Sequence, residues 1–157
     1  MRMHAMMLAV FCQCAAVGLL GAAGDATEDA VKKDLAALKG VWAVVSAEKN
    51  GKKIGSDEFK GVTVTYDGAG KILAERDGKV LFAATFKIDP TKKPRTIDAT
   101  QTSDGDTKGK VLLGIYELKD DTLTFCSQVD PSKDRPTDFT AKAGSGHFLR
   151  VYKRVKN

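Results

Sequence analysis

The sequence predicts an all-β fold, an eight-stranded antiparallel up-and-down barrel preceded by a short N-terminal helix. From residue 40 onward, short apolar or alternating segments are separated by turn residues at regular intervals. The segments between them lack the helices that parallel strands need as crossovers, so the sheet is antiparallel. Eight such strands form either a sandwich or a barrel, and a closed barrel removes the exposed edges.

Residues 1–23 are typical of a secretory signal peptide. Arg2 provides the positive start, residues 5–20 are mostly apolar, and residues 21–23 are the small residues that precede a cleavage site. A membrane anchor is the alternative, but the apolar run is shorter than the ~20 residues that a bilayer requires. We expect cleavage near Ala23 or Gly24, a secreted or periplasmic (cell-envelope) location, and no integral membrane span after cleavage.

The number of cysteines in the mature chain depends on removal of that signal peptide. Cys12 and Cys14 lie inside it, which leaves Cys126 as the one cysteine of the mature chain. A single cysteine forms no intrachain disulfide, so the stability of the mature domain must come from its core. Because Cys126 lies in an apolar segment, we expect a small buried residue rather than a reactive thiol.

Residues 24–39 are expected to form the N-terminal helix and its linker. Val31, Leu35 and Leu38 recur at spacings of four and three residues, which places them on one helical face. Acidic residues occur early in the segment, and the sequence Lys39-Gly40 marks its end. This helix is short and amphipathic, so we expect it to dock on the barrel or to fray.

Residues 40–157 are the predicted barrel domain. The strongest local signal is the dipeptide Asp77-Gly78, which favours a tight hairpin between two strands. The predicted strands are Val41–Lys49, Val62–Tyr66, Lys71–Arg76, Lys79–Asp89, Arg95–Thr102, Lys110–Leu118, Thr122–Gln128 and Phe148–Val155. Within Lys79–Asp89, every second residue is apolar, which predicts one apolar face of the strand: Val80, Phe82, Ala84, Phe86 and Ile88.

The lengths of the loops favour a barrel over a sandwich. In an up-and-down barrel alternate connections lie at the same end, and here alternate connections are long: residues 50–60, 103–109 and 129–147. The tight hairpin at Asp77-Gly78 lies beside them, and the three other short connections close the opposite end. One elaborated mouth and one tight floor are typical of barrels that bind small ligands.

The triplet Gly40-Val41-Trp42, just after the predicted helix, resembles the Gly-x-Trp signature of lipocalins. In that family the tryptophan closes one end of the barrel, and an arginine of the last strand packs across it. The resemblance therefore implies a structural floor made by Gly40 and Trp42 with an arginine. Arg154 is the preferred match, and Arg150 in the same strand is the alternative.

A second resemblance covers nearly the whole mature chain. Residues 38–47, 89–94, 113–118 and 135–147 resemble, in the same order, an uncharacterised family of small secreted lipocalin-like domains found mainly in planctomycete bacteria. The resemblance implies a lipocalin-like, calycin-type barrel. No activity is established for that family, so the resemblance implies no function. The chain lacks the disulfides and the further signatures of well-studied lipocalins.

Catalytic and metal-binding patterns are weak. His147 is the one histidine after the signal, and the sequence offers no second histidine or cysteine pair near it to complete a metal site. The nearby Ser145 lacks the Gly-x-Ser-x-Gly spacing of a nucleophile elbow. Asp104 and Asp106 favour Asp/Gly turn chemistry over a calcium loop. Nothing in the spacing selects a catalytic pair among the glutamates Glu48, Glu58, Glu75 and Glu117. We expect no metal, no cofactor and no enzymatic activity.

The positive charge is scattered. The formal net charge of the chain is +5, and the paired basic residues are separated by acidic ones: Lys32-Lys33, Lys52-Lys53, Lys92-Lys93 and Lys153-Arg154. Nucleic-acid binding requires a clustered basic surface with stacking aromatic residues, so we expect no nucleic-acid partner. The charge favours at most anionic ligands or cell-envelope polymers.

We therefore expect a binder of a small hydrophobic or amphipathic ligand in the lumen, selected by residues of the mouth. The candidates at the mouth are Lys52, Lys53, Phe59, Asp104, Asp106, Arg135 and His147. The alternative is a non-catalytic cell-envelope interaction module with a filled barrel. A lumen without a pocket above roughly 300 Å³ would contradict the first function. The sequence leaves ligand identity and oligomeric state open.

Overall fold

The computed structural model describes residues 22–156, with side chains from Thr27 onward. The expected signal peptide, residues 1–23, therefore lies outside the described residues except for its last two positions. Within residues 22–156, no helix is long and apolar enough to cross a membrane.

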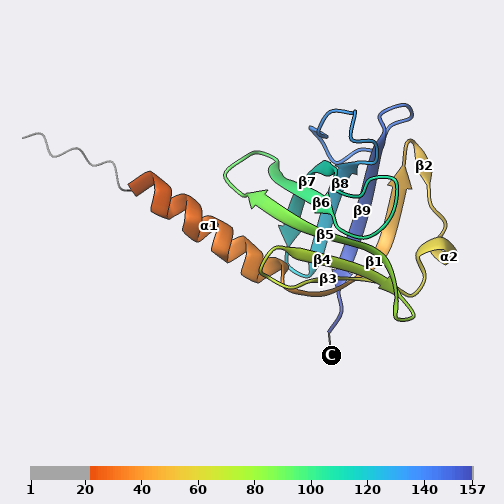
Figure 1. Ribbon diagram of the computed structural model, residues 1–157, viewed down its shortest axis with the longest axis horizontal. Helices are drawn as coiled ribbons and strands as arrows, with labels where there is room; N and C mark the ends of the chain where they lie inside the picture. The colour runs from red at the N-terminus through yellow and green to blue at the C-terminus, as the bar shows by residue number, and fades with distance from the viewer. Residues whose placement is uncertain (1–21, 157) are drawn as a thin grey trace, which may run out of the picture.

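The described chain folds into a closed antiparallel barrel with one helix projecting from it (Figure 1). Eight strands, β1 and β3 to β9, follow one another around the wall, and β9 pairs with β1 to close it. The bounds are α1 (Ala22–Leu38), β1 (Gly40–Lys49), β2 (Lys52–Lys53), α2 (Ser56–Phe59), β3 (Val62–Tyr66), β4 (Lys71–Arg76), β5 (Lys79–Asp89), β6 (Arg95–Gln101), β7 (Val111–Lys119), β8 (Thr122–Gln128) and β9 (His147–Arg154). The fold predicted from the sequence is confirmed.

Tight turns and bulges account for the closure of the sheet. Asp77 and Gly78 have φ of 51° and 76° and reverse the chain between β4 and β5, as the dipeptide predicted. The pairing shifts between Ala74 and Glu75 on β4, and a second shift lies on β1. Such irregularities bend a strand and increase its twist, which a barrel of this size requires.

The expected alternation of β5 fails at the start of that strand. Val80 and Leu81 are 49% and 48% exposed, although one of them was expected to face inward. Both residues lie near the tip of the β4–β5 hairpin, next to the pairing shift. From Phe82 onward the expected alternation holds, because Phe82, Ala84, Phe86 and Ile88 all belong to the core or pack against it.

The first long connection was expected to be a plain loop, but it contains two short elements. Asn50 and Gly51 have φ of 51° and 83° and reverse the chain immediately after β1, so β2 pairs back onto the end of β1. The single-turn helix α2 follows and precedes β3. Asn50-Gly51, at the start of the connection 50–60, is therefore also a hairpin signal.

Helix α1 joins the barrel only through its last turns and otherwise extends away from it (Figure 1). Leu35 and Leu38 pack on the barrel core, and Leu38 is 1% exposed. Asp34, which is also buried, accepts hydrogen bonds from the Tyr116 hydroxyl at 2.7 Å and from Arg95 Nη1 at 3.1 Å. These contacts hold the C-terminal end of α1 against the end of the barrel made by the short loops.

Candidate ligand-binding site

Trp42 fills the closed end of the barrel. Its side chain is fully buried, and its indole Nε1 donates a hydrogen bond to the carbonyl of Leu38 at 2.8 Å. The Arg154 guanidinium lies over the Trp42 ring, with its carbon 4.1 Å from the ring centroid. Gly40 leaves room for this arginine, because a Cβ at residue 40 would approach Arg154 Nη1 to 2.9 Å. The three expected floor residues thus lie together, and Arg154 rather than Arg150 stacks on the tryptophan.

Arg154 also caps the end of α1. Its Nη1 and Nη2 donate to the carbonyls of Lys39 and Ala37, each at 2.7 Å. Carbonyls at a helix C-terminus lack partners within the helix, and a cation there also matches the helix dipole. One side chain therefore closes the barrel floor and attaches the helix to it.

The long loops gather at the opposite end. Asn50 donates its backbone N–H to the carbonyl of His147 at 3.0 Å, and Gly146 donates to Asn50 Oδ1 at 3.3 Å. Thr107 and Val129, from the second and third long loops, line one cavity. This placement agrees with the mouth inferred from loop lengths.

The lumen holds a cavity of about 320 Å³ that extends from the middle of the barrel to this loop end. Its volume is just above the roughly 300 Å³ at the lower end of small-molecule sites. The wall is mainly apolar and aromatic, and its residues are Val64, Tyr66, Ile72, Ala74, Phe82, Ala99, Gln101, Thr107, Leu112, Phe125, Ser127, Gln128, Val129, Phe148, Arg150 and Tyr152.

Arg150 is the centre of one polar cluster in the cavity wall, and Gln101 and Thr107 form a second one nearer the loops. Arg150 Nη2 donates to Ser127 Oγ at 2.6 Å, and the guanidinium carbon lies 4.7 Å from the Phe125 ring centroid and 4.3 Å from that of Phe148. Burial raises the pKa of the Tyr66 and Tyr152 hydroxyls, and the nearby Arg150 cation partly opposes both shifts. Both tyrosines therefore stay protonated and able to donate hydrogen bonds.

The candidates that the sequence placed at the mouth lie around the cavity rather than in its wall. Lys52 and Lys53 are exposed in β2, and Phe59 is half-buried in α2. Asp104 and Asp106 are exposed in the loop after β6, and Asp104 pairs there with Lys108 at 2.6 Å. His147 begins β9 opposite Gln128.

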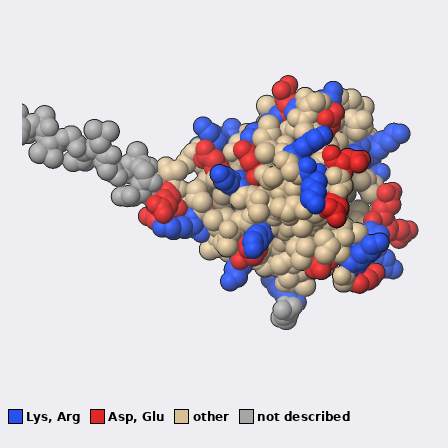
Figure 2. All heavy atoms as spheres, in the orientation of Figure 1, with Lys and Arg blue, Asp and Glu red and all other residues tan. Residues whose placement is uncertain are grey.

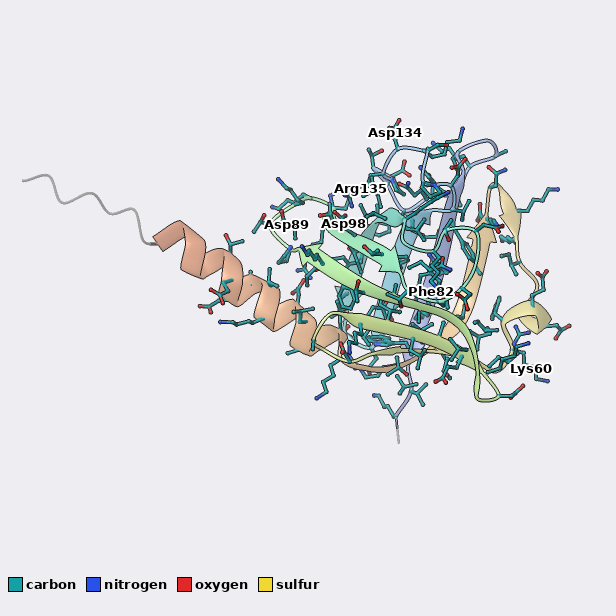
Figure 3. All side chains as sticks on the ribbon, in the orientation of Figure 1. Lys60, Phe82, Asp89, Asp98, Asp134 and Arg135 are labelled. Atoms are coloured by element: carbon teal, nitrogen blue, oxygen red, sulfur yellow. The ribbon has the colours of Figure 1, made fainter. Side chains whose placement is uncertain are left out.

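Arg135 attaches the longest loop to the outer wall. Its Nη1 donates to the carbonyls of Gly114 and Ile97 at 2.8 and 3.3 Å, and its Nη2 lies 2.7 Å from Asp98 Oδ1. Figure 3 shows Arg135 and Asp98 side by side, near the base of that loop. With its hydrogen-bonding groups engaged in this way, Arg135 positions the loop and does not line the lumen.

Sequence reasoning missed the polar residues inside the lumen. Gln101, Ser127, Arg150 and Tyr152 lie on strands, whereas the candidates were taken from loops. A usable signal was present, because Arg150 and Tyr152 are two residues apart and thus share one face of their strand. The same holds for Phe125 and Ser127 on the neighbouring strand β8.

A second hollow, of about 380 Å³, lies by the short loop 90–94 and the end of β7. Although its volume is larger, several of its lining residues, including Lys92, Lys93, Glu117 and Lys119, are exposed. Its lining residues Arg95 and Tyr116 already have their polar groups bonded to Asp34 of α1. The surface drawn in Figure 2 likewise intersperses basic and acidic residues, without a continuous basic patch. Among the residues described, no group of histidine, cysteine and acidic side chains could hold a metal ion.

Cys126 is fully buried, and its thiol donates to the carbonyl of Thr140 at 3.4 Å. Burial raises the pKa of this thiol to about 11, so the reactive thiolate is scarce at neutral pH. We expect iodoacetamide at about pH 8 to leave Cys126 unmodified in the folded protein and to modify it fully in denaturant. Peptide mass spectrometry measures the modification of Cys126 separately from that of Cys12 and Cys14. Rapid modification of Cys126 in the folded protein would contradict its burial.

No protein-family model, no curated protein and no solved structure matches this chain. The function is therefore inferred from the barrel and the side chains that line it.

Proposed function

We propose that this protein binds a small apolar or amphipathic molecule in the barrel lumen, as an exported lipocalin-like protein. The observation that carries the proposal is the cavity of about 320 Å³ with a mainly apolar wall. Small-molecule sites combine such a wall with a few convergent polar groups, and the mouths of β-barrels are common places for them.

The asymmetry of the barrel supports this function. Trp42 and Arg154 close one end, while the cavity reaches the long loops at the other. A molecule that enters between the loops would therefore meet a closed floor and aromatic walls. The alternative function, an interaction module that uses the outer surface, assumes a filled barrel, and the cavity favours the ligand binder over it.

Filling the cavity tests the proposal. Ala99 is an inward residue of β6 and lines the cavity. We expect Ala99→Phe to weaken binding of the neutral fluorescent probe N-phenyl-1-naphthylamine at least roughly tenfold, because the added ring occupies the space of the ligand. The measurement is a fluorescence titration of the folded variant and of the wild type.

The matched control is Thr100→Phe, which adds a ring one residue further along the same strand, on its outer face. This control is expected to bind the probe like the wild type. Equal probe binding by Ala99→Phe and wild type would place the probe outside the lumen and contradict the proposal. Loss of binding in both variants would do the same.

A further inference from the structure

Arg150 is the one charged residue in the wall of the cavity. The wall contains no aspartate or glutamate, and no ion pair of Arg150 is found within residues 22–156. Three other arginines of that part of the chain each contact an aspartate: Arg95 with Asp34, Arg135 with Asp98 and Arg154 with Asp121. Arg150 thus differs from them in having no counter-charge.

The surroundings of Arg150 keep a cation in place without neutralising it. The rings of Phe125 and Phe148 take up its guanidinium through cation–π contacts, and Ser127 accepts one of its five N–H donors. Its Nε–H is buried and has no hydrogen-bond partner. A guanidinium cannot lose its proton to escape an apolar environment, so this group stays charged and partly unsatisfied.

The hydroxyls of Tyr66 and Tyr152 belong to the same cluster. Both tyrosines are 3% exposed and line the cavity beside Arg150. Phenol hydroxyls donate hydrogen bonds, and a guanidinium presents its donors in a planar fork that fits a carboxylate. The cluster therefore offers one positive charge and several donors, next to an apolar space.

We infer that the lumen ligand is an amphipathic carboxylate, with its head bound by Arg150 and its apolar part against the aromatic wall. This inference rests on the proposed binding function and specifies its ligand class. A single negative charge matches the single cation of the wall, and a planar carboxylate matches the fork of the guanidinium. The apolar part of the cavity wall, which includes Ile72, Phe82 and Leu112, can accept a hydrocarbon chain.

Decanoate and decanol test the inference, because they share a chain and differ in the charge of the head. We expect the wild-type full chain to bind decanoate at least roughly tenfold more tightly than decanol in calorimetric titrations, since a charge-assisted hydrogen bond is made to only one of them. The variant Arg150→Met is expected to lose this preference. Lys153→Met, which removes the same charge from an exposed position of β9, is expected to keep it.

Thermal unfolding separates a binding role from a structural role. Because Arg150 lacks a counter-charge, we expect ligand-free Arg150→Met to melt at the same temperature as the wild type or higher. A clear decrease in its melting temperature, together with equal wild-type affinities for the two probes, would assign Arg150 to structure and overturn the inference. If the variant does not fold, the affinities of the wild type for decanoate and decanol still test the inference.

The outcomes distinguish the two proposals. Equal affinities of the wild type for decanoate and decanol would overturn the carboxylate inference and leave the proposed binding function standing. A preference for decanoate that persists in Arg150→Met would have the same consequence. Failure of both probes to bind would contradict the binding function itself, and the inference with it.

Discussion

Replacing Trp42 with alanine is expected to lower the free energy of unfolding by about 3–5 kcal/mol, the largest loss expected from a single core substitution here. The indole is fully buried and belongs to the core cluster at the closed end. Its removal would leave a cavity, free the Leu38 carbonyl of its donor and remove the surface on which Arg154 stacks. Urea unfolding followed by circular dichroism measures the change.

Val45→Ala is the matched control for this substitution. Val45 lies on the same strand but is 49% exposed, so its truncation is expected to change stability by no more than about 0.5 kcal/mol. A loss below about 1 kcal/mol for Trp42→Ala would mean that the closed end tolerates a void. That result would contradict the role of Trp42 as the floor of the barrel.

Arg154→Met is expected to cost about 2–3 kcal/mol of unfolding free energy, because two charge-assisted hydrogen bonds and one cation–π contact are lost together. The loss should also release the C-terminal turn of α1, whose Ala37 carbonyl would no longer have Arg154 as its donor. Urea unfolding measures the stability, and hydrogen exchange of the α1 amides measures the release of the helix.

Lys156→Met provides the control for Arg154→Met. Lys156 and Arg154 both contact Asp121, at 2.6 and 3.5 Å, but the Lys156 side chain is 75% exposed. Exposed ion pairs contribute little, so this control is expected to lose no more than about 0.5 kcal/mol and to keep α1 protected. Equal losses in the two variants would show that the charge near Asp121 matters and not the contacts of Arg154 with Trp42 and the helix.

The fold was predictable because local signals determine most of it. Turn dipeptides such as Asp77-Gly78 set the hairpins, and the pattern of long and short loops placed the mouth and the floor at opposite ends. What the sequence did not show depends on contacts between distant residues. Asp34 accepts a hydrogen bond from Tyr116, 82 positions further along the chain, and the residue spacing within α1 does not predict this contact.

The site was less predictable than the fold, for a physical reason. Both faces of β9 carry large apolar or aromatic residues, Phe148 and Tyr152 on one face and Leu149 and Val151 on the other. The inward face therefore follows only from the register with β1 and β8. A pairing shift between Val44 and Ser46 further alters which β9 residue lies opposite β1. From the sequence, Arg150 was therefore expected only as an alternative partner of Trp42, whereas in the structure it lines the cavity.

The central claim, that the lumen is a binding cavity, is tested most directly by NMR titration of the ¹⁵N-labelled protein with decanoate. We predict saturable shifts of the amides of Ala99 and Ser127 and of the buried Arg150 Nε–H, with an unchanged Trp42 indole signal at the closed end. Signals of the lumen that stay fixed while decanoate is added, or shifts confined to outward residues such as Thr100, would contradict the claim.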